Sequence, residues 1–215
     1  MYVPKHFAFP EGGLSELHDL IEDQVFGTLV APGDGSSNSD RGLQAVHMPF
    51  VLDRSVGQYG TLAGHVARAN PVWRTFAPER EVLVICQGPH CYVSPDWYAS
   101  AGLVPTWNYV AVHCYGRPRR VADADAVTAH LRQLSALAEE RLLPKRPWTL
   151  DKIQPTTLAT LISHIVAFRI EITRIEGKRK LNQNRSAADR AGVIRALDGS
   201  GRSDDQDIAE AMRGL

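Results

Sequence analysis

The sequence predicts a mainly β protein of the α+β class, an antiparallel β-barrel with peripheral helices. Three observations predict it. Short apolar or alternating segments recur at regular spacing, and helical periodicity is concentrated toward the C-terminal end. No strand–helix–strand rhythm and no G-x-G-x-x-G motif accompany them. A Rossmann fold is therefore excluded, because it needs that rhythm around a glycine-rich turn.

The N-terminal third predicts a helix followed by two strands. Ser15 is the expected N-cap of a short amphipathic helix, and residues 26–31 predict the first strand. Residues 43–52 predict the second strand, in which Pro49 indicates a sheet edge or a bulge. The polar, glycine-rich segment 31–42 between them predicts a mobile hairpin connection.

The middle of the chain predicts three more strands. Residues 59–66 form the first and residues 81–87 form a buried one, while ARANPVWRTF between them predicts a turn or a brief helix. GPHCYVSPDWY then starts at a Gly-Pro turn and ends in a Pro-Asp-Trp-Tyr corner. VPTWNYVAVHCYGRP is the longest strand signal, and its alternation places five residues on one face: Trp107, Tyr109, Ala111, His113 and Tyr115.

The C-terminal part predicts helices around one further strand. Residues 123–141 and 156–164 have helical periodicity, and FRIEITRI alternates as a strand. The tail begins as a basic loop, after which Ser186 caps a helix with Asp189 at the capping-box position. The final residues predict a weak, acidic helix.

Composition narrows the function classes. The chain has 215 residues, and 24 Lys and Arg residues balance 24 Asp and Glu residues, so the formal net charge is zero. We do not expect nucleic acid to bind over the whole surface, because that binding depends on Lys and Arg neutralising phosphates. No apolar run approaches the roughly 20 residues of a membrane span, and the N-terminal segment lacks a secretory signal. Three cysteines without a C-x-x-C pair favour the reducing cytoplasm.

His65 is the leading candidate for a cofactor ligand. It ends a predicted strand just before a turn, where a barrel presents side chains to a cleft, and imidazole is a standard axial ligand for haem iron. A neutral ring can equally hydrogen-bond a flavin phosphate, and the plain alternative is a histidine bonded to local backbone. Arg68 and Asn70 follow within one turn, and an arginine suits either a flavin phosphate or a haem propionate.

Other residues compete for the same roles. His47 and His113 are rival ligands, and His113 shares its predicted face with Trp107 and Tyr109, which suits a planar ring or a barrel core. Gln87, in the CQGPHCY segment, joins the cofactor-binding candidates. Thiolate is the other strong haem ligand, but Cys86, Cys91 and Cys114 are expected to be small buried hydrophobes. The chain lacks G-x-S-x-G, H-E-x-x-H and P-loop motifs.

A local excess of positive charge follows the last predicted strand. Residues 174–195 hold seven basic side chains against two acidic ones. Three interpretations stay open: a clamp for a cofactor's phosphate or propionates, a nucleic-acid patch, and a solvated face. The amides of Gln183 and Asn184 favour directed hydrogen bonding, and no aromatic residue is interleaved to stack bases. Lys180, Gln183 and Arg185 are the cofactor-binding candidates from this segment.

Six segments resemble, in order, the hallmark motifs of the PaiB family: MYVPKHF, HMPFVL, GHVARANPVWRTF, CQGPHCYVSPDWY, VPTWNYVAVHCYG and EGKRKLNQNRSAADR. This family carries the label of FMN-binding negative transcriptional regulators. The resemblance implies a split β-barrel of the pyridoxamine-phosphate-oxidase type, assembled as a homodimer with cofactor sites at the subunit interface. We divide the chain into a barrel domain with inserted helices, 1–175, and a basic loop with C-terminal helices, 176–215, packing on the barrel or on the dimer partner.

The resemblance implies two functions. One is regulation of gene expression with FMN. The other belongs to a branch of similar proteins, the piperazate synthases, which bind haem b and close the N–N bond of L-piperazate from N5-hydroxy-L-ornithine. We rank the haem-dependent cyclase first, because the net charge is zero, no DNA-reading helix is recognisable and several histidines lie on strands. His65 would then bind the iron, and His65, His113 and Tyr109 are the catalytic candidates. An FMN-binding regulator or flavin-binding protein is the alternative.

Overall fold

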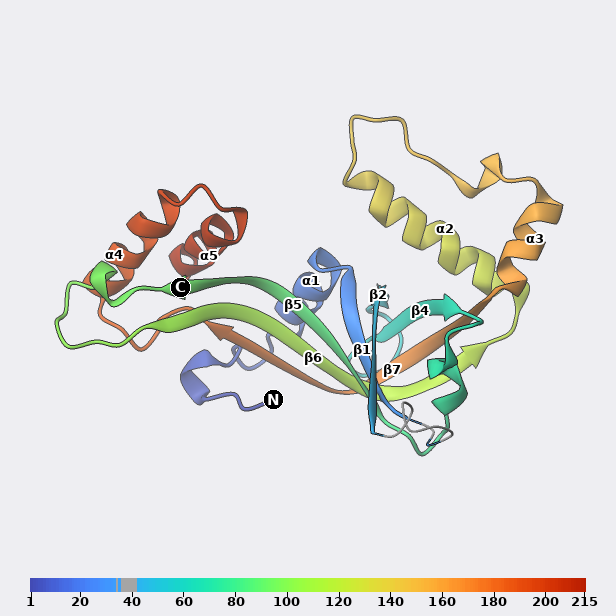
Figure 1. Ribbon diagram of the computed structural model, residues 1–215, viewed down its shortest axis with the longest axis horizontal. Coiled ribbons are helices and arrows are strands. Elements are labelled where there is room, and N and C mark those ends of the chain that lie inside the picture. The colour runs from blue at the N-terminus through green and yellow to red at the C-terminus, as the bar shows by residue number, and fades with distance from the viewer. Residues whose placement is uncertain (34, 36–41) are drawn as a thin grey trace. The chain divides into compact units, whose positions relative to one another are not determined.

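The computed structural model describes residues 1–33, 35 and 42–215 (Figure 1). In this part of the chain the strands form one antiparallel sheet in the order β2-β1-β5-β6-β7-β4-β3. The helices lie before, between and after the strands in the sequence, and the predicted mainly β fold with peripheral helices is confirmed. None of the described helices is long and apolar enough to cross a membrane.

The contacts divide the chain into two compact units. Unit 1 consists of Met1–Leu20, Gln87–His113 and Glu176–Leu215, and unit 2 consists of Ile21–Cys86 and Cys114–Ile175. One boundary therefore falls after residue 175, where the sequence analysis ends the barrel domain. Two earlier stretches nevertheless group with the C-terminal segment in unit 1.

Unit 2 holds the short strands. They are β1 (Phe26–Pro32), β2 (Leu43–Pro49), β3 (Val51–Asp53) and β4 (Thr61–Ala67). The single strand predicted over 43–52 is two strands, because residues up to Pro49 pair with β1 whereas residues from Val51 pair with β4. β2 and β3 are consecutive in sequence yet stand at opposite ends of the strand order. The chain at Phe50 therefore joins the two ends of the sheet, which closes it into a barrel.

The predicted hairpin between the first two strands is confirmed by their pairing. Pro32 pairs with Leu43, and the N–H of Gly33 donates to the carbonyl of Gly42 at 2.7 Å. The predicted mobility of this connection concerns residues 34 and 36–41, which lie outside the described residues.

Three long strands contribute residues to both units: β5 (Val82–Val93), β6 (Thr106–Val121) and β7 (Ile165–Lys180). The turn predicted at Gly88-Pro89 is wrong, because both residues continue β5. β1 pairs only with residues 83–85, so the N–H that Pro89 lacks is not needed for a bond to β1. The basic loop predicted from residue 176 is also wrong at its start, since residues 176–180 extend β7.

β6 has the alternation that the sequence predicts. Asn108, Val112 and Cys114 are fully buried, whereas Trp107 on the other face is 54% exposed. Gly116 marks a close approach of β6 to β7 in unit 2, because a Cβ atom there would lie 2.2 Å from the carbonyl oxygen of Glu171. Only glycine lets the two backbones approach in this way.

The helices of unit 2 match their predicted positions. α2 (Ala124–Glu140) begins after Asp123, whose carboxylate accepts a hydrogen bond from the N–H of Ala126 at 2.8 Å. α3 (Pro155–Ser163) follows after a 3-10 turn, η4 (Leu150–Lys152). The brief helix predicted after β4 is a 3-10 helix, η2 (Pro71–Thr75).

Unit 1 contains α4 (Ala187–Asp198), α5 (Ser203–Arg213) and most of α1 (Leu14–Asp23), with 3-10 turns η1 (Lys5–Phe7) and η3 (Pro95–Trp97). α1 begins at Leu14, so Ser15 lies inside the helix and is not its N-cap. Ser186 caps α4 as predicted: its Oγ accepts from the N–H of Asp189 at 3.1 Å and donates to the Asp189 carboxylate at 2.7 Å.

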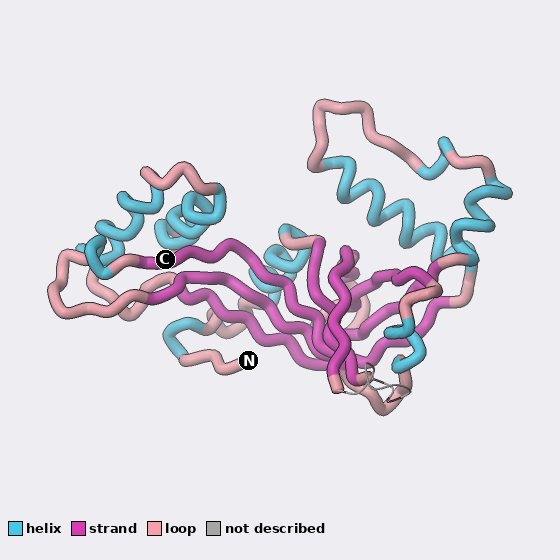
Figure 2. Tube along the Cα trace, viewed as in Figure 1, coloured by secondary structure: helices cyan, strands magenta, loops and turns pink. Residues whose placement is uncertain are grey.

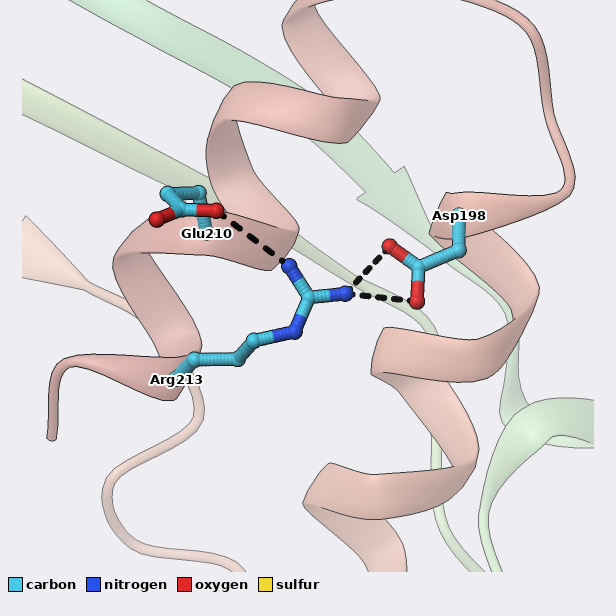
Figure 3. Close-up of polar contacts among 3 residues, drawn as sticks. All are labelled: Asp198, Glu210 and Arg213. Carbon is cyan, nitrogen blue, oxygen red and sulfur yellow. Dashed lines mark hydrogen bonds and ion pairs between the residues drawn. The ribbon is translucent and has the colours of Figure 1, made fainter.

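The last two helices form the core of unit 1 together with β5 and β6 (Figure 2). Leu197 of α4 and Ile208 of α5 are 0% exposed and pack in one cluster with Cys91 and Val110. Arg213 of α5 donates to both carboxylate oxygens of Asp198 of α4, at 2.5 and 2.6 Å (Figure 3). The C-terminal helix, weak by its sequence pattern, is therefore a central part of this unit.

Candidate functional site

His65 lies in β4 and contacts a second histidine of unit 2. Its Nδ1 atom lies 3.1 Å from the Nε2 atom of His130, which belongs to α2. The two rings meet edge to face, with centroids 5.3 Å apart. His130 is 8% exposed, whereas His65 is half-buried. The pair therefore links the strand to the helix through two side chains of the same type.

Burial determines the charge of both rings. Desolvation lowers the pKa of His65. Desolvation also lowers the pKa of His130 to about 4, with smaller contributions from His65 and the cation of Arg169. Both rings are therefore neutral near pH 7, and one of them must donate an N–H to the lone pair of the other.

The direction of that hydrogen bond fixes what His65 offers to a ligand. When its Nδ1–H donates to His130, its Nε2 atom keeps an unprotonated lone pair. No residue in the described part of the chain hydrogen-bonds that Nε2 atom. Metal-ligating histidines share this arrangement, with one ring nitrogen bonded to a partner and the other bearing the lone pair. In that direction His65 has the form of an axial ligand; in the other direction, its Nε2–H would be a donor instead.

Arg68 and Asn70, the other candidates next to His65, have local bonding partners in unit 2. The guanidinium of Arg68 donates to the carbonyl oxygens of Ser163 at 2.6 Å and Ile165 at 2.9 Å. The side chain of Asn70 accepts from the N–H of Val72 at 3.0 Å and so caps η2. Both residues shape the chain after β4, and Arg68 keeps further N–H groups for a ligand.

A second group of candidates comes together in unit 1, on β5, β6 and β7. The ring of His90 stacks on Trp107 with centroids 6.1 Å apart, and Tyr92 meets the same indole edge to face. Gln87 lies 3.4 Å from His90 through its amide nitrogen. Lys180 donates to the carbonyl of Trp107 at 2.8 Å and also to the hydroxyl of Thr106. Trp107 and its neighbours therefore form a partly exposed aromatic surface beside an ammonium group.

Of the other two candidates in the basic segment, Gln183 stabilises a turn and Arg185 lies over an aromatic ring. The Gln183 side chain accepts from the N–H of Leu181 at 2.8 Å and donates to the carbonyl of Arg179 at 2.7 Å. These bonds enclose Asn182, whose φ of 61° is left-handed. Arg185 lies over the ring of Tyr98, 5.5 Å from its centroid.

The remaining candidates have other surroundings: His47 is on another strand of unit 2, and His113 and Tyr109 belong to unit 1. His47 is exposed on β2, where it pairs with Thr28. His113 is half-buried at the end of the β6 segment of unit 1. Tyr109, also in unit 1, lies under the ammonium of Lys178, which is 5.3 Å from its ring centroid. The predicted residues therefore belong to two groups, one in each unit.

The cysteines are the small buried residues that the sequence predicts. All three are free thiols, each at most 1% exposed. Burial raises the pKa of Cys86 and of Cys91 to about 12, so neither is a thiolate near pH 7. Within the described residues, no group of three His, Cys, Asp or Glu side chains could hold a metal ion.

His130 is the site residue that sequence reasoning missed. It stands three residues after Val127 on the buried side of α2, where a histidine is indistinguishable from a satisfied core residue. The available signal was a titratable side chain at a position where the helical pattern calls for an apolar one.

The chain is similar to proteins of a known family. Residues 1–174 match the family described as "Putative FMN-binding domain". The chain is 33% identical over 212 residues to the protease synthase and sporulation protein PAI 2 of Bacillus subtilis, with 99% of this chain and 96% of that protein covered.

Two solved structures share the fold. One is the FAD and heme binding protein of Mycobacterium smegmatis, with a TM-score of 0.54, 19% identity, and 82% of this chain and 76% of that chain covered. The other is the flavocytochrome Anf3 of Azotobacter vinelandii, with a TM-score of 0.51, 15% identity, and 77% and 66% covered. The split-barrel fold implied by the sequence motifs is thereby confirmed.

Proposed function

Because the chain belongs to the family of putative FMN-binding domains and is PaiB-like, we propose that it is a cofactor-dependent protein. The cofactor that we propose is haem b, bound through His65. The observation that carries this proposal is the 3.1 Å contact between His65 Nδ1 and His130 Nε2. With Nδ1–H as the donor, this contact engages one nitrogen of a half-buried imidazole and leaves Nε2 unprotonated for iron. The M. smegmatis protein, which is named for FAD and heme together, supports the use of this fold for haem.

Electrostatics support the same assignment. An iron ligand must present a neutral imidazole, and desolvation lowers the pKa of His65. Its partner His130 is buried, so water does not compete for the Nδ1–H of His65. The chain would thus hold the ligating ring in one tautomer and one orientation.

For the reaction we propose intramolecular N–N bond formation, from N5-hydroxy-L-ornithine to L-piperazate. The N–N bond forms as the N–O bond breaks, and the hydroxyl group leaves with one amine proton as water, so no external oxidant or reductant is needed. Bound haem would supply Lewis-acid polarisation of the N–O bond. The protein would contribute orientation of the two nitrogens and exclusion of bulk water.

An absorption spectrum tests the cofactor. The purified full-length protein, reconstituted with haem, is expected to give a Soret band that His65→Ala removes. His164→Ala is the matched control, because His164 is an exposed histidine of the same unit and is not among the ligand candidates. A flavin spectrum in the purified protein, or a Soret band unchanged in folded His65→Ala protein, would contradict the haem assignment.

Product analysis tests the reaction separately. The haem-loaded protein is incubated with N5-hydroxy-L-ornithine, and a product lighter by one water is sought by mass spectrometry. It is expected with wild-type protein and not with His65→Ala. If the Soret band is normal but this product is absent, the proposal of haem binding stands and the proposed cyclase reaction is rejected.

Flavin binding is the second candidate, favoured by the family and by the aromatic surface of unit 1. The 54% exposed indole of Trp107, with His90 stacked on it and Lys180 beside it, can take a planar, anionic ligand. FMN titration followed by flavin fluorescence tests this, with Trp107→Ala expected to weaken binding and Trp148→Ala of unit 2 as control. Equal binding by both variants would reject this surface. A regulatory role would further require specific DNA retention with steep salt dependence.

A further inference from the structure

Unit 2 contains a cavity of about 530 Å³ where the chain leaves β4 and enters β7. Arg68 and Arg120 line it with seven aliphatic residues, among them Val127, Ile162 and Ala167. This volume is in the range of small-molecule sites. Two cations beside seven aliphatic residues suit a ligand with one anionic end and a short apolar part.

Arg68 is positioned by the backbone around it. Its Nε and Nη2 atoms donate to the carbonyl oxygens of Ser163 and Ile165, at 2.6 and 2.9 Å. Its own backbone N–H donates to the carbonyl of His164 at 2.8 Å. These bonds use two of the five N–H groups of the guanidinium, and the Nη1 group remains for an anion.

Arg120 is positioned by an aromatic ring. Its Cζ atom lies 5.7 Å from the ring centroid of Trp73, and the indole N–H of Trp73 donates to the carbonyl of Arg68 at 2.9 Å. Trp73 therefore links the two arginines. Because Arg68 is held by its two hydrogen bonds, little of its side-chain entropy is lost when an anion binds.

The cavity carries net positive charge. None of the described residues that line it is acidic. The acidic residue nearest to its β6 end in sequence is Asp123, whose carboxylate is already bonded to the N-terminus of α2 through Ala126. An anion entering the cavity would therefore meet two guanidinium groups that lining carboxylates do not neutralise.

The cavity adjoins the histidine pair. Ala167 is the register partner of His65 between β4 and β7, so their side chains share one face of the sheet. Val127 lies three residues before His130 in α2, so those side chains share one side of the helix. A ligand in the cavity would lie beside the two rings.

From this juxtaposition we propose that unit 2 has a binding site for a small organic carboxylate. Arg68 and Arg120 hold the carboxylate, and the aliphatic residues between them contact the short apolar part of the ligand. Guanidinium suits this role because its planar fork matches the two oxygens of a carboxylate. The site does not depend on the cofactor proposed for His65, since neither ring of the histidine pair lines it.

Isothermal titration calorimetry of the full-length protein with hexanoate tests the site. Hexanoate is expected to bind saturably at one site. Acetate lacks the apolar body and 1-hexanol lacks the charge, so each is expected to bind at least about ten-fold more weakly. Inorganic phosphate that binds as tightly as hexanoate would overturn the assignment to an organic carboxylate.

Three variants localise the binding. Arg120→Met keeps a long side chain without its charge, and it is expected to lower the affinity for hexanoate by about ten-fold or more. Arg119→Met is the matched control, because Arg119 is an exposed neighbour that does not line the cavity. Ile162→Trp fills the cavity while both arginines remain, and it should also remove binding. Wild-type affinity in a folded Arg120→Met protein would overturn the proposal.

The same titration on haem-loaded protein separates this site from a cofactor site. Hexanoate affinity is expected to be unchanged by haem. If haem displaces hexanoate, the two arginines bind its propionates and the separate site is rejected. If haem does not bind at all, the haem proposal fails while the hexanoate result stands.

Discussion

His65 Nδ1 and His130 Nε2 lie 3.1 Å apart, so β4 and α2 are joined by a hydrogen bond that exists only while at least one ring is neutral. A proton added to the lone pair that accepts this bond leaves two N–H groups facing each other. The contact therefore links acid stability and ligand chemistry in one place.

Stability should fall with pH between about 6.5 and 4. The folded pKa of His130 is lowered from 6.5 to about 4 by burial, so in this window the unfolded state binds the extra proton. The loss of unfolding free energy is absent above pH 6.5, grows as the pH falls and is complete below pH 4. It amounts to roughly 3 kcal/mol at most.

Urea unfolding of wild type and His130→Leu at pH 7.5, 6, 5 and 4.5 measures this effect. The variant should have a visibly shallower decline across this series, whatever its stability at pH 7.5. Parallel declines would show that His130 does not carry the effect.

Loss of His130 should also change the tautomer of His65. In wild-type protein we expect the Nδ1–H form, which leaves Nε2 unprotonated. In His130→Leu the acceptor is gone, and the Nε2–H form should become populated. Long-range ¹H–¹⁵N correlation spectra of the haem-free protein distinguish the two forms. His130→Gln restores an acceptor oxygen and is expected to recover part of the Nδ1–H population.

Substitution by alanine should destabilise the protein at one glycine near α4 and have little effect at another. A Cβ atom at Gly192 would lie 2.0 Å from the carbonyl oxygen of Trp97, so Gly192→Ala must push α4 away from η3. A Cβ atom at Gly199 has nothing nearer than 3.7 Å, and Gly199→Ala should be close to neutral. We expect a cost of about 1–3 kcal/mol for Gly192→Ala from overpacking. Equal unfolding midpoints for the two variants would contradict the close packing of α4 on η3.

The ion pair between Arg213 and Asp198 should contribute far less than the apolar contacts beneath it. Both side chains are nearly half exposed, so salt should weaken their coupling. Leu197→Ala, by contrast, empties a 0% exposed position and should cost about 2–5 kcal/mol. A double-mutant cycle on Arg213→Ala and Asp198→Ala at low and high salt measures the coupling. A large, salt-independent value would indicate a structural role for the pair.

Much of the fold was predictable because periodicity is a local property. The helix predicted over 123–141 is α2 with both caps included, and the cap at Ser186 begins α4 as expected. The strand over 43–52 was predicted as one because nothing local marks Phe50 as the place where one sheet end meets the other. The turn at Gly88-Pro89 failed because the missing N–H of proline matters only where a neighbouring strand needs it.

The site was less predictable. His65 was a candidate because it ends a predicted strand just before a turn, but its partner His130 is 65 residues away on a helix whose pattern is typical of a core. Arg68 was assigned to a cofactor because it follows His65, and the structure gives it two backbone carbonyls as partners. Arg120 gave no sequence signal, since it lies among other arginines at the end of β6. Long-range pairing, which only the fold supplies, decides these roles.

The interleaving of the two units has a consequence for the history of the protein. Unit 1 is encoded in three separate stretches, and the two stretches of unit 2 lie between them. One crossover or one insertion of contiguous DNA therefore cannot add it, remove it or exchange it for another. Relatives with a different unit 1 must have diverged residue by residue, or by several coordinated insertions. For the same reason, no single contiguous segment of this chain contains a whole unit that could be expressed by itself.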